Sequence, residues 1–216
     1  MSIQYLAVLD HVHLDNGLFL TSFAKAIASH QHRGLILHSD SAYTDRIIQT
    51  GVMREEAKVR AVKDLNHRLI ALLADHGVSA IGINGYQREM ISQSNDNIKV
   101  DKKKFNALPE QPVLIISTLI HSADSDQPMF SPIADVAAAL KKRLNIDDMF
   151  LFTRSEEDDI IKKELPGSLS QIDEREQFIR NSVPEEFQDK LPDGRLITAS
   201  EFGKYPNIEN ATRLRE

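Results

Sequence analysis

Histidine and aspartate side chains gather at the ends of several predicted β-strands, where they could bind a metal ion. Imidazole nitrogens and carboxylate oxygens are ligands that zinc and other transition metals take. However, His11 and His13 would point to opposite faces of a continuing strand unless a turn intervenes, and the spacing matches no established metal motif. Polar loops with hydrogen-bonded histidines are therefore the preferred interpretation, and a metal site is the alternative. The residues concerned are His11, His13, His38, His121, Asp10, Asp15 and Asp40.

The composition is that of an ordinary soluble globular protein, with 41% apolar and 27% charged residues. The net charge of −6 argues against a nucleic-acid partner, because such proteins usually present a basic face. No apolar run approaches the roughly 20 residues that span a bilayer, and the N-terminus MSIQYLAVLD does not have the pattern of a signal peptide. Without cysteine, disulfides and thiolate ligands are excluded. We therefore expect a cytoplasmic protein with no membrane partner.

Six short runs rich in leucine and β-branched residues predict β-strands. Most are continuously apolar rather than alternating, as expected for strands that are covered on both faces. The runs are YLAVLD at 5–10, LILHS at 35–39, VSAIGI at 78–83, VLIIST at 113–118, MFLFT at 149–153 and RLITA at 195–199. By contrast, residues 154–194 are strongly charged and predict exposed helices and loops without a clear strand.

Two helices are predicted between these strands, each with recognisable ends. Residues 55–77 carry apolar side chains at spacings of three and four, and Gly77 suits a C-terminal cap. Residues 131–145 begin with Ser131 as a possible N-cap and Pro132 at the first helical position. Three basic residues then occupy the last turn, where the helix dipole favours positive charge.

Strands that alternate with helices predict an α/β fold, a three-layer α/β/α sandwich with a mainly parallel sheet. Ligands of such sheets bind beyond the carboxyl ends of the strands. That edge should carry the polar segments DHVHLD, HSDSA, NGYQ and TLIHSAD, of which the first is expected to be a polar turn. The histidines and aspartates would then lie together at the functional edge.

The order of these elements resembles the amino acid kinase superfamily, and N-acetylglutamate kinase most closely. Leu65–Gln87 looks like that family's helix, strand and glycine-bearing substrate loop, and residues 112–118 and 130–153 resemble its later half. The resemblance implies a single domain over residues 1–216, with a substrate-side lobe at 1–110 and a shortened nucleotide-side lobe at 111–216. It also implies a homodimer, whose contact would use the helix layer near Glu55–His76.

The family's phosphate-binding segments are altered in this chain. The first strand of the family ends in Lys-x-Gly-Gly, and Val8 stands at the position of the phosphate-holding lysine. The second strand ends in His-Gly-Gly-Gly, whose glycines are replaced here by Ser-Asp-Ser. A second family lysine has Glu185 at its nearest candidate position. The phosphate-loop equivalents are Asp10, His11, His38, Ser39, Asp40 and Ser41.

On the substrate side, the resemblance implies that Gly82, Asn84 and Gly85 lie against a small molecule. A simple turn is an equally good interpretation, because asparagine and glycine both tolerate positive φ. Arg54 could bind a substrate carboxylate through its guanidinium, although an exposed arginine at a helix start is the preferred interpretation.

The family's asparagine-rich helix motif is also changed in part. Ser131 and Ile133 replace its two asparagines, so that Ser131 becomes a candidate substrate-binding residue, and Asp135 remains as the candidate catalytic residue. The preferred alternative for Asp135 is a carboxylate near a helix N-terminus, which the dipole stabilises by about 0.3–1 kcal/mol.

These changes argue against the family's usual chemistry. Phosphoryl transfer depends on positioning and on neutralising charge, and losing one preorganised donor can cost about 2.7–4 kcal/mol. The first hypothesis is therefore a degenerate N-acetylglutamate kinase-like protein without conventional phosphotransfer, which keeps a small-molecule pocket or a structural or regulatory role. The second is a divergent active kinase of an amino-acid carboxylate, which would need Mg-ATP. The third is a metal-binding protein or metal-dependent enzyme. No cofactor is otherwise predicted, and no residue is assigned as a metal ligand.

Overall fold

The main sheet contains all six predicted strands. The computed structural model describes residues 3–39, 54–95, 97–110, 112–154 and 164–215. Within these ranges a seven-stranded sheet has the order β11-β10-β9-β1-β2-β6-β3, and its strands are parallel except for β11. The strands are β1 (Tyr5–Leu9), β2 (Gly34–His38), β3 (Ala80–Ile83), β6 (Val113–Ser117), β9 (Asp148–Phe152), β10 (Arg195–Ile197) and β11 (Thr212–Arg213).

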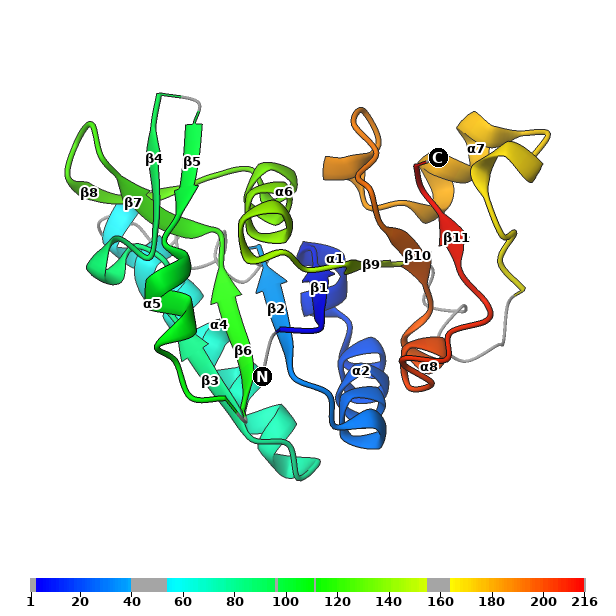
Figure 1. The fold of residues 1–216 in the computed structure, drawn as a ribbon, viewed down its shortest axis with the longest axis horizontal. Coiled ribbons are helices and arrows are strands. Elements are labelled where there is room, and N and C mark those ends of the chain that lie inside the picture. Colours follow the sequence, from blue (N-terminus) through cyan, green and yellow to red (C-terminus); the bar gives the residue numbers. More distant parts are fainter. Residues whose placement is uncertain (1–2, 40–53, 96, 111, 155–163, 216) are drawn as a thin grey trace.

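Helices cover both faces of this sheet, as β1 illustrates. Tyr5, Ala7 and Leu9 pack with α2, α4 and α8, whereas Leu6 and Val8 pack with α6 and a second sheet. The two layers lie on opposite sides of the main sheet (Figure 1). The predicted three-layer α/β/α fold is therefore confirmed. The helices are α1 (His11–Asp15), α2 (Gly17–His30), α4 (Arg54–Asp75), α5 (Lys102–Asn106), α6 (Ile133–Leu144), α7 (Arg175–Ser182) and α8 (Ala199–Phe202).

A second, four-stranded sheet was not predicted. Its order is β5-β4-β7-β8, and several of its residues are partly exposed, so it lacks the continuous apolar runs that marked the main sheet. The segment TLIHSAD, expected as a loop at the functional edge, instead enters β7. The strands are β4 (Ile91–Ser94), β5 (Asn97–Val100), β7 (Leu119–Ser122) and β8 (Gln127–Phe130).

The expectation of a polar turn at residues 10–15 is wrong, because this stretch forms α1. The Asp10 side chain accepts a hydrogen bond from the backbone N–H of His13 and caps the helix. Asn16 caps α2 in the same way through the N–H groups of Leu18 and Phe19. Aspartate and asparagine are strong N-cap residues, so both helix starts had a recognisable signal in the sequence.

The start of α6 also differs from expectation. Ser131 is not its N-cap: Pro132 occupies that position, and no side chain caps the helix. The hydroxyl of Ser131 is buried and has no hydrogen-bond partner among the described residues. The three basic residues do lie in the last turn, as predicted.

Residues 154–194 form helices and loops, as expected, although residues 155–163 lie outside the described part. Besides α7 they include the 3₁₀-helices η3 (Leu169–Gln171) and η4 (Glu185–Phe187), and Leu169 and Phe187 are buried in the core. A further 3₁₀-helix, η1 (Gln87–Glu89), follows β3. Across the described ranges, no helix combines the length and apolar character needed to cross a membrane. The expected lobe boundary at residue 110 stays a prediction; β6, which follows it, pairs between β2 and β3.

Candidate functional site at the carboxyl edge of the sheet

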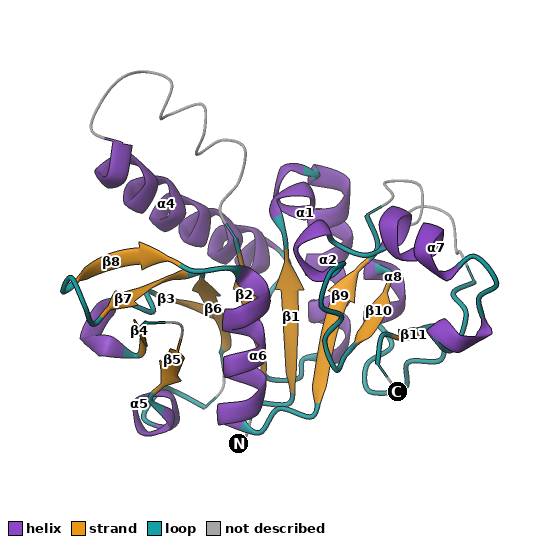
Figure 2. Cartoon of the chain, turned by 90° about the horizontal axis from the view of Figure 1, so that it is seen from above, coloured by secondary structure: helices purple, strands orange, loops and turns teal. Residues whose placement is uncertain are grey.

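The predicted edge residues come together through a row of backbone hydrogen bonds. Ser39 N–H donates to the carbonyl of Leu9 at 3.2 Å, which ties the end of β2 to the end of β1. Thr118 N–H donates to the carbonyl of His38 at 3.0 Å, and Ser131 N–H donates to the carbonyl of Thr118 at 3.1 Å. The ends of β1, β2 and β6 and the start of α6 therefore form one continuous polar edge. Figure 2 shows α1 at this edge, beyond the arrowhead of β1.

Asp10 and His13 form a buried ion pair at the start of α1. Asp10 Oδ1 lies 2.6 Å from His13 Nδ1, and the two side chains are 2% and 3% exposed. His13 Nε2 lies 3.0 Å from the carbonyl oxygen of Thr153, at the end of β9. Both ring nitrogens of His13 thus lie close to oxygen atoms.

The contact with His13 determines the charge state of Asp10. Burial by itself would raise the pKa of Asp10, but the hydrogen bonds and positive charge of His13 outweigh it and hold that pKa below its ordinary value. A fixed carboxylate therefore occupies the positive N-terminus of α1. A free helix N-terminus is a favourable phosphate site, and this one is already filled.

His38 has a partner that the sequence did not reveal. Its side chain is fully buried, with Nε2 3.0 Å from Oδ1 of Asn66 on α4 and Nδ1 2.7 Å from the carbonyl oxygen of Ser39. The contact ties the end of β2 to the helix that covers it. Asn66 is 4% exposed and lies on the apolar face of α4, where a polar residue signals a specific partner.

In the GING segment the two glycines are needed for close packing, whereas the asparagine makes a polar contact. A Cβ on Gly82 would lie 3.0 Å from Cδ1 of Ile70, and a Cβ on Gly85 would lie 3.2 Å from the backbone oxygen of Leu119, so close packing accounts for both glycines. Asn84 donates to Gln87 Oε1 at 3.3 Å, whereas its own Oδ1 is buried without a hydrogen-bond partner among the described residues. Ligand contact by these three residues stays a prediction.

The other predicted residues are spread over the surface or lie outside the described part. Asp135 is exposed in the first turn of α6, and His11 is exposed at the start of α1. Asp40 and Ser41 fall outside the described residues, and nothing is described of the side chain of Arg54.

The strand-end histidines do not converge on one point. His13 pairs with Asp10 and His38 contacts Asn66, while His121 lies in β7, 3.6 Å from Asp126. In the described ranges, no three side chains of histidine, aspartate or glutamate are grouped so that they could hold a metal ion.

A cavity of about 640 Å³ lies between α4 and the β7–β8 hairpin, next to the polar edge. The lining of this α4–hairpin cavity is mixed: Val59, Leu119 and Phe130 are apolar, whereas Arg60 and Lys63 are cationic. The size is typical of small-molecule sites, which are mainly apolar with a few polar groups. The sequence did not predict it, because its two walls are more than 50 residues apart in the chain. The remaining lining residues are Glu56, Asp64, His67, Gln127 and Pro128.

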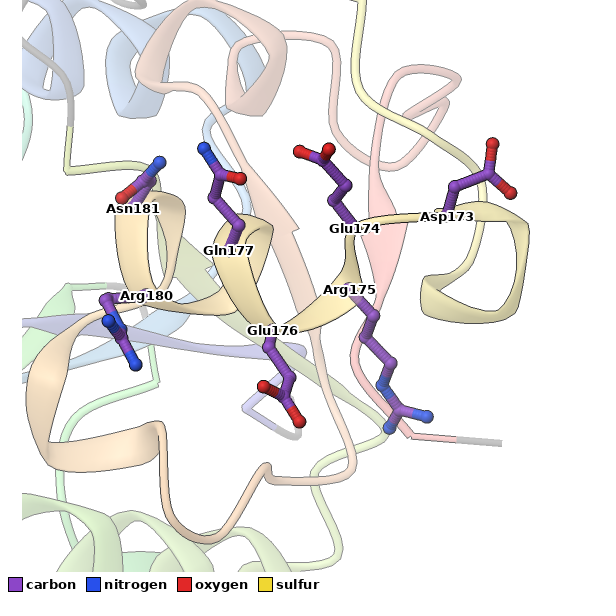
Figure 3. Close-up of a pocket in the computed structure, with 7 residues that line it drawn as sticks. All are labelled: Asp173, Glu174, Arg175, Glu176, Gln177, Arg180 and Asn181. Atoms are coloured by element: carbon purple, nitrogen blue, oxygen red, sulfur yellow. The ribbon is translucent and has the colours of Figure 1, made fainter.

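A second large hollow, of about 850 Å³, lies along α7 and is formed by a single segment, residues 173–181. Figure 3 shows that its side chains diverge: Glu176 and Arg180 point to one side of the helix, and Gln177 and Asn181 to the other. Groups that bind one small molecule must converge, so this hollow is a surface feature of an exposed helix.

No known family profile and no curated protein sequence matches this chain. Solved structures do match. An isopentenyl phosphate kinase has a TM-score of 0.60 at 14% identity, covering 93% of each chain. Aspartate kinase from Synechocystis has a TM-score of 0.67 at 12% identity, covering 98% of this chain and 40% of that one. The protein smu.665 from Streptococcus mutans UA159 has a TM-score of 0.65 at 12% identity, covering 98% and 99%. At these identities the likeness shows a shared fold, that of the amino acid kinases.

Proposed function

We propose that this chain is a degenerate, N-acetylglutamate kinase-like protein that binds a small molecule and has no conventional ATP-dependent phosphotransfer. The observation that carries the proposal is the buried Asp10–His13 ion pair at the N-terminus of α1. A phosphate-handling turn needs free backbone N–H groups and positive charge. Here the carboxylate of Asp10 accepts from the backbone N–H of His13, and it brings negative charge to the same place.

Electrostatics makes this pair hard to reconcile with a bound polyphosphate. Two like charges 4 Å apart repel by about 4 kcal/mol at the effective dielectric of a protein surface. A phosphate oxygen at that distance from Asp10 would meet a repulsion of this size, which the charge of His13 offsets only in part. Protonating Asp10 would relieve the repulsion, but His13 holds its pKa below the ordinary value.

The α4–hairpin cavity suits a ligand with a carboxylate at one end and an apolar or acyl part at the other. Arg60 and Lys63 can neutralise the carboxylate, and Val59, Leu119 and Phe130 can cover the rest. An N-acylated amino acid has both parts, so N-acetylglutamate is the first ligand to test.

Calorimetric titration with Mg-ATP, with and without N-acetylglutamate, tests both halves of the proposal. We expect no saturable heat with Mg-ATP at millimolar concentration, and saturable heat with an acyl amino acid. Arg60→Gln should weaken binding of the acyl amino acid, because Arg60 lines the cavity. Arg68→Gln is the matched control, since Arg68 is equally exposed on α4 but does not line the cavity. Equal weakening in both variants would contradict binding in this cavity.

A divergent active kinase is the second candidate, and the start of α6 favours it. This twelve-residue helix has no side-chain cap, and the unpaired hydroxyl of Ser131 lies beside its N-terminus at the polar edge. A phosphate there could use both the helix N–H groups and the hydroxyl. Saturable Mg-ATP binding that Ser131→Ala weakens would favour this candidate over the first.

A further inference from the structure

A groove of about 850 Å³ with a strong positive charge lies between α5 and the C-terminal end of α6. We call it the lysine groove, after the residues that line it. Figure 2 shows α5 and this end of α6 on the side of the main sheet opposite to α1, so the groove is separate from the polar edge. Its six cations are Lys99, Lys102, Lys103, Lys104, Lys142 and Arg143.

The charge of the groove is opposite to that of the whole protein. Glu89 and Asp101 are the two carboxylates that line it, which leaves an excess of four positive charges in a chain whose net charge is −6. A basic groove on an otherwise acidic protein attracts anions selectively to one place, because the surrounding surface repels them.

Two of the six cations have polar partners, and one of these partners is a carboxylate. Lys104 pairs with Asp101 at 3.4 Å and also donates to backbone carbonyls. Lys102 Nζ lies 3.1 Å from the side-chain oxygen of Asn145, in the amide orientation that satisfies both partners. The other four make no ion pair with any residue that the structure describes. These four are Lys99, Lys103, Lys142 and Arg143.

Helix dipoles favour cations on both helices of the groove, but they do not offset the repulsion between the two sets. Lys142 and Arg143 lie in the last turn of α6, where the helix dipole favours cations. Lys103 and Lys104 likewise lie in the last turn of the five-residue helix α5. They line the same groove as the cations of α6, so like charges from two helices meet there. This gathering of like charges lowers stability unless an anion binds between them.

We propose that the lysine groove binds a small anion with two or more phosphate groups. Ammonium groups neutralise phosphate as point charges, and the guanidinium of Arg143 can hold two phosphate oxygens at once. Cations contributed by β5, α5 and α6 surround the same space, so a single phosphate could not contact all of them. The site does not depend on the proposed function, because it shares no residue with the polar edge or the α4–hairpin cavity.

Calorimetric titration of the whole chain with inorganic tripolyphosphate, in a magnesium-free buffer, tests the proposal. We expect one saturable site, with an affinity that falls as salt concentration rises. The double variant Lys103→Gln/Arg143→Gln should bind about tenfold more weakly, since it removes two charges close to the anion. The double variant Arg175→Gln/Arg180→Gln is the control: it makes the same change in net charge on the exposed surface of α7.

Circular dichroism of each variant establishes that it is folded before it is titrated. An equal loss of binding in both double variants would overturn the proposal, because it would indicate a general charge effect. Unchanged binding in the groove variant together with loss in Ser131→Ala would place the anion at the polar edge and would also overturn it. Orthophosphate and citrate serve as comparison anions. Binding of either one as tight as that of tripolyphosphate would contradict a site built for several phosphates.

Discussion

Asp10 Oδ1 lies 2.6 Å from Nδ1 of His13, and together the two residues join three elements of the fold. Asp10 directly follows β1 and caps α1, while His13 reaches the carbonyl oxygen of Thr153, directly after β9. The pair therefore links the carboxyl ends of β1 and β9 at the edge of the sheet.

Removing the carboxylate of Asp10 should destabilise the protein strongly. Asp10→Ala leaves the buried His13 unpaired and removes the helix cap, so we expect a loss of about 3–5 kcal/mol in the free energy of unfolding. Asp10→Asn should lose less, because asparagine keeps the cap. Urea denaturation of the three proteins measures the difference. A loss below about 0.5 kcal/mol for Asp10→Ala would show that the pair is not formed.

Acid should weaken the protein through the same residue. The pKa of Asp10 is held below its ordinary value of 3.8, so its contribution to stability is complete above that value and disappears as the pH falls through the lower, folded-state pKa. The stability of the wild type should therefore fall more steeply below pH 3.8 than that of Asp10→Asn. Thermal melting at a series of pH values compares the two slopes, and parallel curves would contradict the prediction.

His30 should produce a separate loss of stability at higher pH. Burial lowers its pKa from 6.5 to about 4, and the neighbouring His32 adds to the shift. The ring packs against Tyr5 and Tyr205 and accepts a hydrogen bond from His32 N–H on Nδ1, which requires a neutral Nδ1. Because the unfolded chain takes up a proton between pH 6.5 and 4 and the folded chain does not, stability is full above pH 6.5 and falls towards pH 4.

His30→Gln should reduce this loss between pH 6.5 and 4. His67→Gln is a suitable control, because His67 is exposed on α4. The midpoint of urea unfolding at pH 7 and pH 5 provides the comparison. NMR titration of the His30 ring gives a direct test, and protonation near pH 6.5 would contradict the prediction.

Gly34 should tolerate no side chain. It pairs with Tyr5 across β1 and β2, and an added Cβ would lie 2.0 Å from two atoms of the Tyr5 ring. Gly34→Ala should therefore cost at least about 1–3 kcal/mol through overpacking. Gly17→Ala is the matched control: no atom lies within 4 Å of its added Cβ, so it should be neutral or slightly stabilising. Chemical denaturation of both variants measures their free energies of unfolding. An equal change in the two variants would contradict the prediction.

The sequence by itself determined the main sheet and its layers. The buried runs 5–9, 35–37 and 113–116 are apolar throughout, and strands with this pattern must be covered on both faces. It also determined that the polar ends of β1 and β2 would lie side by side, because parallel strands bring their carboxyl ends to one edge.

Only the tertiary structure decided what those residues do. The sequence placed Asp10 at the edge, but whether its charge was free or paired depended on α1, which turns His13 back towards it. The partner of His38 on α4 and the two walls of the α4–hairpin cavity come from segments far apart in the chain. The same holds for the lysine groove, whose cations on α5 and α6 are separated by about 40 residues. A local sequence pattern indicates which faces of a segment must be buried. Contacts between segments far apart in the chain form only when all the segments pack together.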